Sequence, residues 1–525
     1  MNAKVIVSGA IILFVGNMLS SLLGLSREVL LAAQYGTGMD MDSYLFANTI
    51  PAIILSFMSG IFSSGFIPLY IKHRVDYGAE KASLLYSNTI NWMLLLLAVV
   101  AVNCYVFSPY LSELFAPNKE AQAQIMHLLW ILIPTLFFFT LSYAQSMVLN
   151  SVNHFLLPAL LTLFNNIVMI VFIVFLHNTL GIYSVAWGYL IGTVIQVLVQ
   201  LPIMRKKKLR YRFYINWKDE TIRRLLAMSI PIAGLVVIDQ CTVLATRYFA
   251  ANLAEGSASA LNFANRIVML PVSLFGTAII SSTFPSAVQM FSENKFKEYE
   301  RLITTTVKSI VLVLVPVMVL CGAFAKYIIR ALLERGAFDA NATQMTSFAF
   351  ILAAVGILLY PIRDFFVKLL ISRNSMRTPI LSSVLYAFVF IASCMLTVPH
   401  MAYKGIAISN AVALIVSFAF LVIRYKQLDR DIKIRVSLGF VSKIVSSSVI
   451  AAFAAITFQH ECLPYLSKWL PSETVGTLLS LAIGLAVYAA IVKGWKIEEI
   501  NFVYEKMLAK FRYNKKSSVS ARSGG

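Results

Sequence analysis

Fourteen long apolar stretches constrain this chain more than any other feature of its sequence. A helix that crosses a bilayer needs about 20 mostly apolar residues, and lipid allows only closed hydrogen-bonding structures such as helices. The chain has 525 residues, of which 59% are hydrophobic and only 13% are charged, against about 25% charged in soluble proteins. We therefore predict an all-α polytopic membrane protein with about fourteen transmembrane helices. The stretches are 5–25, 43–68, 88–108, 125–149, 155–177, 181–203, 225–250, 259–285, 305–325, 345–371, 380–398, 403–423, 438–458 and 473–492.

Loops that are rich in lysine and arginine alternate along the chain with loops that contain few of these residues. They are frequent after the second, sixth, eighth and twelfth stretches and in the tail after Ile491, and rare in most of the opposite loops. The loop with Lys326, Arg330 and Arg335 is the exception. Because cytoplasmic loops carry an excess of basic residues, both termini are expected to be cytoplasmic. The N-terminal stretch could also be a signal peptide, but its cleavage pattern is poor and further spans follow at once.

A basic linker at residues 204–224 separates the first six stretches from the next six. Its run Arg205-Lys206-Lys207-Lys208-Leu209-Arg210-Tyr211-Arg212 could attract anionic lipid headgroups. The simpler interpretation, which we favour, is a topology signal. The tail at 493–525 contains an apolar helical pattern from Ile497 to Phe511 that would suit the membrane surface.

Short motifs recur along the chain at one offset. Phe46-Ala47-Asn48 returns as Phe263-Ala264-Asn265, and Ile67-Pro68 returns as Phe284-Pro285. Six spans separate the copies, so both copies would have the same orientation in the membrane, as in transporters with parallel repeats. We predict an N-lobe at 1–203, the linker at 204–224, a C-lobe at 225–424, two further spans within 425–492 and a cytoplasmic tail at 493–525.

A few polar side chains lie within the predicted spans, where charge is costly and therefore needs a partner or a function. Arg266 is the strongest candidate for a binding residue. It shares a helix face with Asn262, and the repeat places Thr49 at the equivalent position, so symmetry does not explain it. A guanidinium in a cavity suits phosphate or pyrophosphate, which it can bind with two hydrogen bonds. The alternative is an ion pair with Asp239 or Asp42. The full candidate set is Arg27, Asp42, Asn262, Asn265 and Arg266 for binding, with Asp239, Arg247, Arg363 and Asp364 as structural or coupling residues.

Two of these candidates have strong structural alternatives. Arg27, near the end of its span, could simply extend its charged group toward the interface. Asp364 and Lys368 have the spacing of an intrahelical ion pair, which makes the neighbouring Arg363 and Asp364 primarily structural or cytoplasm-facing.

Motifs for enzyme chemistry are absent from the sequence. It contains no phosphate-binding P-loop, no GxSxG and no HExxH motif. The five cysteines form no CxxC pair, and those in apolar stretches are expected to be small buried hydrophobes. His460-Glu461-Cys462 has no further ligands at metal-binding spacing. We expect neither an enzyme nor a cofactor, metal or nucleic-acid partner.

Three motifs resemble the MurJ/MviN family. They are Ser20-Ser21-Leu22-Leu23-Gly24-Leu25-Ser26-Arg27-Glu28 with Gly36-Thr37-Gly38 and Asp42; Asn262-Phe263-Ala264-Asn265-Arg266 with Leu270-Pro271 and Phe284-Pro285; and Arg363-Asp364 with Ser372-Arg373-Asn374 and Thr378-Pro379. The similarity runs from about residue 10 to residue 425.

This resemblance implies a specific fold and function. The family has the MOP flippase fold and exports lipid II, the undecaprenyl-pyrophosphate-linked peptidoglycan precursor, across the bacterial inner membrane. Cavity arginines would bind the pyrophosphate, and Arg27, Asp42 and Arg266 match family functional positions. The last two spans would form a groove for the lipid tail. The bilayer and cell-wall synthesis enzymes are candidate partners.

The sequence also departs from the family pattern. Ser21 and Leu55 stand where family members usually have arginines, Ser59 lies near the position of an acidic residue, and Thr246 replaces an aspartate of members with a sodium site. The departures keep open a flippase for another lipid-linked oligosaccharide. A multidrug-extrusion-type antiporter and a non-transporting scaffold for envelope synthesis are the further alternatives.

Overall fold

A computed structural model describes residues 3–495 except 117, 153, 208, 210, 374, 429–433, 435 and 463–472. The tail predicted at 493–525 therefore lies almost wholly outside the described residues. Twelve helical segments in the described part are long and apolar enough to cross a membrane. The first and seventh predicted spans are also helical, as α1 (Ala3–Tyr35) and α9 (Glu220–Ala251), although neither belongs to these twelve. The predicted all-α multi-pass membrane fold is confirmed.

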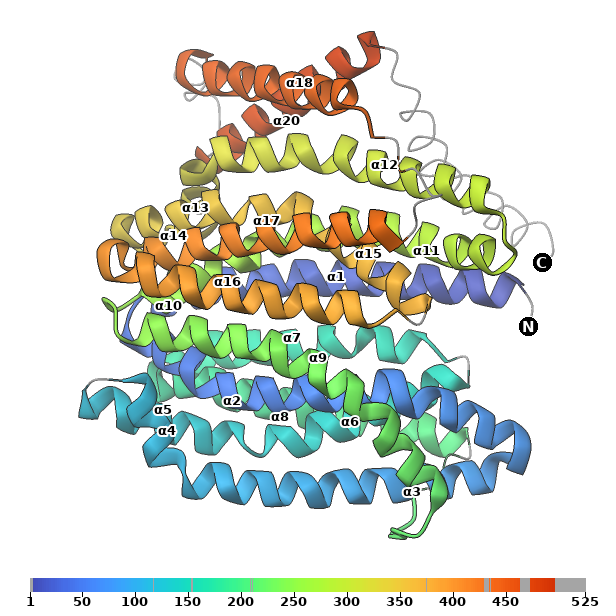
Figure 1. Ribbon diagram of the computed structural model, residues 1–525. Helices are drawn as coiled ribbons and strands as arrows, with labels where there is room; N and C mark the ends of the chain where they lie inside the picture. Colours follow the sequence, from blue (N-terminus) through green and yellow to red (C-terminus); the bar gives the residue numbers. More distant parts are fainter. Residues whose placement is uncertain are drawn as a thin grey trace, which may run out of the picture. The chain divides into compact units, whose positions relative to one another are not determined.

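Helices form the architecture of the whole described chain (Figure 1). The further elements are α2 (Met39–Ile61), η1 (Phe62–Phe66), α3 (Ile67–Val106), α4 (Ser108–Phe115), α5 (Lys119–Leu132), α6 (Thr135–Ser151), α7 (Leu156–Leu180), α8 (Tyr183–Lys206), α10 (Ser257–Pro271), η2 (Val272–Gly276), α11 (Thr277–Ser292), α12 (Phe296–Ala323), α13 (Ala325–Leu333), α14 (Ala340–Ala353), α15 (Val355–Ser372), α16 (Arg377–Met401), α17 (Tyr403–Leu428), α18 (Leu438–Thr457), η3 (Phe458–Cys462) and α20 (Glu473–Gly494).

The repeated sequence motifs lie on corresponding helices. Phe46-Ala47-Asn48 is part of α2, and Phe263-Ala264-Asn265 is part of α10. Each of these helices continues into a single π-helical segment, η1 or η2, before the next α-helix begins. Such π-turns interrupt regular helices and are frequent at functional sites. This shared interruption is a feature of the repeat that the sequence did not predict.

Two compact units make up the chain, and neither is one continuous half of it. Unit 1 comprises residues 1–266, 333–349 and 383–413, and unit 2 comprises residues 267–332, 350–382 and 414–525. The division into consecutive lobes remains a prediction.

Unit 1 has a core between α2, α3 and α6, in which Leu55, Phe62, Tyr86 and Leu136 are buried. Alongside it, α7 packs against both α1 and α8, and α8 packs against α6. The α6–α8 contact is polar at its centre, because Gln200 Nε2 donates to Ser142 Oγ at 2.9 Å. Interhelical hydrogen bonds of this kind stabilise helix packing in membranes, where lipid removes the hydrophobic driving force.

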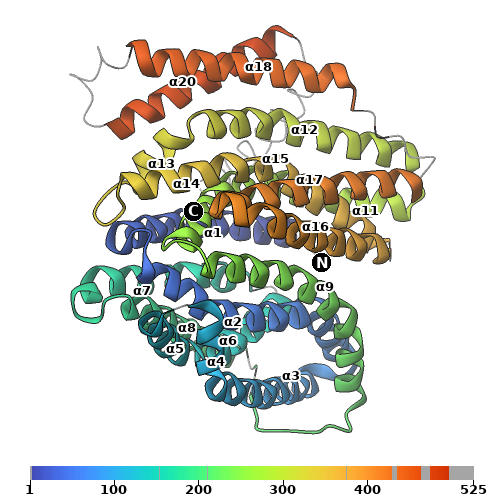
Figure 2. The ribbon, with the colours of Figure 1, turned by 60° about the vertical axis from the view of Figure 1, so that its left-hand side comes forward.

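In unit 2, α12 packs against α11, α15 and α18, and α18 packs in turn against α20 (Figure 2). Gly484 allows close approach here, because a Cβ atom at this position would lie 2.9 Å from Leu320 Cδ2 and 3.0 Å from Ala455 Cβ. Tyr488 Oη donates to the Leu312 carbonyl at 2.7 Å, which joins α20 to α12. Small residues and polar contacts thus hold the C-terminal helix pair to the rest of unit 2.

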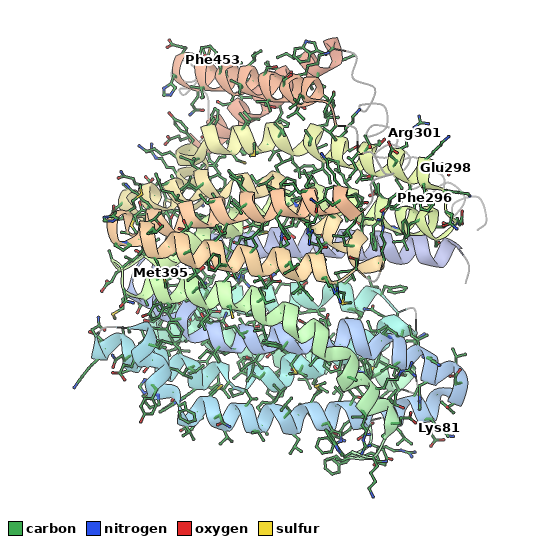
Figure 3. The ribbon with its side chains drawn as sticks, in the orientation of Figure 1. Lys81, Phe296, Glu298, Arg301, Met395 and Phe453 are labelled. Atoms are coloured by element: carbon green, nitrogen blue, oxygen red, sulfur yellow. The ribbon has the colours of Figure 1, made fainter. Side chains whose placement is uncertain are left out.

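Large apolar side chains project from the outer surface of both units. Met395 of unit 1 and Phe453 of unit 2 are examples, and both are exposed (Figure 3). In a soluble protein such a density of exposed apolar groups would favour aggregation, whereas in a bilayer these side chains contact lipid.

Candidate functional site

Arg27, at the centre of the candidate site, is held by polar groups from two helices of unit 1. Its Nη2 atom lies 2.6 Å from Glu28 Oε1, and its Nη1 atom donates to Asn166 Oδ1 at 3.0 Å. Asn166, on α7, also donates to the backbone carbonyl of Ser20 at 3.3 Å. The side chain of Arg27 is only 18% exposed, so its charge is compensated mainly by protein groups.

Arg266 shares the carboxylate that binds Arg27. Its Nε atom lies 3.7 Å from Glu28 Oε1, and its side chain is 58% exposed whereas that of Glu28 is 7% exposed. The alternative partners expected for Arg266 were Asp239 and Asp42, and the structure instead shows this pair with Glu28. Two guanidinium groups therefore share one carboxylate, and this three-residue cluster carries a net positive charge.

Hydrogen bonding in the cluster is incomplete. Arg27 Nε and Glu28 Oε2 are both buried, and neither has a hydrogen-bond partner within the part of the chain that the structure describes. Buried polar atoms are nearly always hydrogen-bonded in native proteins. Such atoms therefore mark a place where a ligand or water would complete the network.

Two tyrosines and a third arginine border the cluster. Tyr44 on α2 and Tyr189 on α8 are close enough to Arg27 and Arg266 to interact with them electrostatically. Arg247, on α9, is within the same range of Arg266 and Asp42. The site can therefore offer phenolic hydroxyls as well as guanidinium groups to an anionic ligand.

Asp42, another candidate binding residue, accepts hydrogen bonds from the backbone at the start of α10. Its Oδ2 accepts from the backbone N–H of Gly256 at 2.8 Å, and its Oδ1 accepts from that of Ser259 at 2.7 Å. The carboxylate thus caps the N-terminus of α10 from a distant position in the chain, where the helix dipole also favours negative charge. Both oxygens are occupied by backbone groups, so Asp42 joins α2 to α10.

Backbone contacts reinforce this junction at the same end of unit 1. The N–H of Ala337 donates to the Ala33 carbonyl at 2.8 Å. Gly336 (φ +59°) and Gly256 (φ +85°) permit such approaches, because a Cβ atom would lie 2.2 Å from Ala33 O and 2.8 Å from Thr37 O, respectively. The backbone segments at the ends of α1, α2 and α10 are therefore so close that no side chain fits at these two glycines.

The remaining candidate residues lie on α9, α10 and α15. Asn262 and Asn265 are half-buried on α10, on the same helix as Arg266, and Asp239 is exposed on α9. Asp364 Oδ2 lies 2.7 Å from Lys368 Nζ on α15, which confirms the predicted intrahelical pair. Arg363 belongs to the same helix in unit 2.

No group of three or more His, Cys, Asp or Glu residues in the described part of the chain could hold a metal ion. The cysteines are free, and the expectation that those in apolar stretches are buried is wrong for Cys241, which is exposed on α9.

Sequence reasoning missed Glu28 and Asn166 as the groups that hold the arginines. Glu28 stood beside Arg27 in the sequence, so an acidic residue within a span was the available signal. Asn166 lies 139 residues away from Arg27 and carried no signal of its own.

The family model described as "Lipid II flippase MurJ" matches residues 31–475. The chain belongs to the MurJ family. A protein of Haemophilus influenzae named "Probable lipid II flippase MurJ" is 25% identical over 497 residues, which is 91% of this chain and 96% of that protein. The "Lipid II flippase MurJ" of Burkholderia cenocepacia is 25% identical over 407 residues, or 75% of this chain and 79% of its own length.

Solved structures show the same fold. "Lipid II flippase MurJ, inward closed conformation" covers 95% of this chain and 100% of its own, with a TM-score of 0.77 and 24% identity. A multidrug resistance MATE family transporter of the MOP superfamily covers 80% of this chain and 99% of its own, with a TM-score of 0.66 and 14% identity. The predicted family and fold are confirmed, and the chain belongs to a transporter family and not to an enzyme family.

Two positions where this chain departs from the MurJ pattern, Leu55 and Thr246, have different surroundings. Leu55 is buried in the apolar core of unit 1, so an arginine there would require a rearranged core. Thr246 Oγ1 donates to the Thr242 carbonyl of its own helix at 2.8 Å.

Proposed function

We propose that this protein is a flippase that carries lipid II from the cytoplasmic to the outer leaflet of a bacterial inner membrane. The Arg27–Glu28–Arg266 cluster is the observation on which the proposal rests. It has net positive charge, an exposed guanidinium on Arg266 and buried polar atoms without partners among the described residues. A pyrophosphate supplies the acceptor oxygens that such a cluster lacks.

The roles of the two arginines differ in this proposal. Arg266 makes the first contact with the pyrophosphate, because its side chain is largely exposed. Arg27 is positioned by Glu28 and Asn166, and its positive charge attracts the pyrophosphate from a more buried position. Tyr44 and Tyr189 donate further hydrogen bonds to the pyrophosphate. Asn262 and Asn265 lie on the same helix as Arg266 and belong to the proposed binding site.

Transport would proceed by alternating access between an N-lobe at 1–203 and a C-lobe at 225–424, with both termini cytoplasmic. The parallel repeat supports this scheme, because equivalent lobes can rock about a central site. The last two spans would accept the lipid tail. The membrane potential or an ion gradient would reset the carrier, since a charge that crosses the field gains about 2.3 kcal/mol per 100 mV. Enzymes of cell-wall synthesis would supply and consume the substrate.

A flippase for another lipid-linked oligosaccharide is the second candidate. It is favoured by Ser21 and Leu55, which leave this site without two arginines of the family pattern. The pyrophosphate would be common to both substrates, and the glycan would differ.

Complementation tests the proposal and separates the two candidates. The chain would be expressed in a bacterium whose own lipid II flippase can be shut off, beside Arg266→Ala and the control Arg301→Ala at equal membrane abundance. Arg301 is an exposed arginine on α12, outside the cluster. Growth with the parent and with Arg301→Ala, and lysis with Arg266→Ala, is the expected result. Lysis with a well-expressed parent would overturn lipid II as the substrate.

A further inference from the structure

Part of the connection between α8 and α9 lies along the helix α3. We call its residues 211–219 the α8–α9 strap. Hydrogen bonds join it to one face of α3: Ser87 Oγ accepts from Arg212 N at 3.0 Å, Asn91 Nδ2 donates to Tyr214 O at 3.0 Å, and Asn88 Oδ1 accepts from Asn216 N at 2.8 Å. All of these residues belong to unit 1. The strap is thus held on α3 because side chains of α3 form hydrogen bonds with the backbone of the strap.

Ser87, Asn88 and Asn91 are buried beneath the strap, although α3 crosses the membrane. Without the strap these polar groups would face the surroundings of the helix, where lipid offers no hydrogen bonds. Ser87 is six residues after Lys81, which is exposed on the same helix (Figure 3), so the two lie about 9 Å apart along the axis. The polar zone of each leaflet is about 5–8 Å thick. A position this close to the charged end of the helix suits the level of the lipid headgroups.

Aromatic side chains cover the outer surface of the strap. Phe213 is 81% exposed, and Tyr211 and Trp217 are about half exposed. Trp217 packs edge-on against Trp92 of α3, with ring centroids 4.9 Å apart. Tryptophan and tyrosine are enriched where a membrane meets water, because their rings suit both environments. An aromatic row of this kind indicates contact with a bilayer surface.

Positive charge surrounds this aromatic row. Arg205, Lys206, Lys207, Arg212 and Lys218 are all exposed. Two acidic groups lie nearby: Glu80 pairs with Arg212 at 3.3 Å and offsets that one charge, and Asp219 caps α9 through the N–H of Thr221 at 2.9 Å. The pKa of His154, in the loop between α6 and α7, is lowered by partial burial and then by the charge of Lys207. The end of α8 and the strap thus present a surface of exposed basic groups and aromatic rings.

We propose that this surface binds the headgroups of anionic phospholipids and anchors the connection between α8 and α9 in the membrane interface. The proposal is independent of the transported substrate. Lysine and arginine attract anionic headgroups at the surface, and the exposed aromatic rings supply contact with the glycerol and upper acyl region. A soluble acidic protein would match the charge but would leave Phe213 and Trp217 without a reason to lie at headgroup level.

Fluorescence quenching of Trp217 tests this proposal on the full-length chain in lipid nanodiscs. The Trp217 signal is the difference between the parent chain and Trp217→Phe. Nanodiscs of phosphatidylcholine would contain increasing fractions of dibrominated phosphatidylglycerol or, in parallel, of dibrominated phosphatidylcholine. We expect half-maximal quenching at a clearly lower fraction of the anionic lipid. Equal quenching by the two lipids would overturn the anionic preference, and no quenching by either would overturn membrane contact and favour a soluble acidic partner.

Matched variants locate the binding surface. Lys206→Gln with Lys207→Gln should reduce the preference for phosphatidylglycerol by roughly fivefold for each charge removed. Lys297→Gln with Arg301→Gln removes the same charge from exposed positions of α12 and should leave the preference unchanged. Phe213→Ser should weaken Trp217 quenching by both lipids, whereas Phe296→Ser, at another exposed phenylalanine, should not. Equal effects of the paired variants would overturn the assignment to the strap.

Discussion

At the scale of single residues, the two arginines of the site, Arg27 and Arg266, have different environments. Arg27 is mostly buried and lies 2.6 Å from Glu28, whereas Arg266 is largely exposed and lies 3.7 Å from the same carboxylate. A close buried pair is strongly destabilising when one partner is removed, because the other charge remains uncompensated. A longer pair whose cation stays largely in water contributes less, because solvent screens that charge. The environments therefore predict separable effects on stability and transport.

Arg27→Ala should lower the free energy of unfolding by about 3–5 kcal/mol, because it leaves Glu28 buried without its closest partner. Arg266→Ala should change it by less than about 1 kcal/mol and yet abolish lipid II export. Thermal unfolding of the purified variants in detergent, beside complementation, measures the two effects. Equal losses of stability would contradict the assignment of Arg266 to binding.

Sequence reasoning at this scale identified the arginines but not their partners. Charge within an apolar span is conspicuous, so Arg27 and Arg266 could be found from the sequence. The pairing depends on helices brought together by packing: Arg266 is more than two hundred residues from Glu28. For the same reason the sequence did not reveal that the carboxylate of Asp42 accepts hydrogen bonds from Gly256 and Ser259.

At the scale of elements, the lengths of the apolar stretches predicted where the long helices lie. They did not predict the π-helical segments that interrupt these helices. Helices occur at all fourteen predicted positions because lipid leaves the backbone no other choice there. The π-helical segments η1 and η2 depend on local packing. At η2, a Cβ atom on Gly276 would lie 2.6 Å from Pro361 Cγ, and no pattern of sequence reveals that contact.

Asp42→Ala should expose the first turn of α10. Loss of a helix cap costs about 0.5–2 kcal/mol, so the amides of Gly256 and Ser259 should lose protection. Hydrogen exchange followed by mass spectrometry would measure this in residues 252–262. Asp40→Ala is the matched control, since Asp40 lies in the same turn of α2 and accepts from Gln124 instead. Unchanged exchange in Asp42→Ala would show that the cap is dispensable.

At the scale of the whole molecule, the proposed alternating access between the N-lobe and the C-lobe would require that the tie between α1 and the segment before α14 opens during transport. Ala33 and Ala337 are joined there by a backbone hydrogen bond of 2.8 Å. A pair of cysteines at these two positions would test whether the tie opens, because a disulfide would hold it closed. The tie is therefore a place where transport can be stopped reversibly.

Ala33→Cys with Ala337→Cys, in a chain whose five native cysteines are replaced by serine or alanine, should form a disulfide and stop growth in the complementation strain. A reducing agent should restore growth, and each single cysteine variant should support it throughout. Export that continues while the disulfide is fully formed would contradict opening at this tie.

The central claim is that this chain moves lipid II and that Arg266 is needed for the movement. Purified protein in liposomes that contain lipid II tests it directly, with lipid II that reaches the far leaflet measured by a membrane-impermeant enzyme that cleaves its exposed headgroup. The parent chain and Arg301→Ala should move lipid II well above protein-free liposomes, and Arg266→Ala should not. Movement by Arg266→Ala at the parent rate, or no movement by the folded parent, would contradict the account.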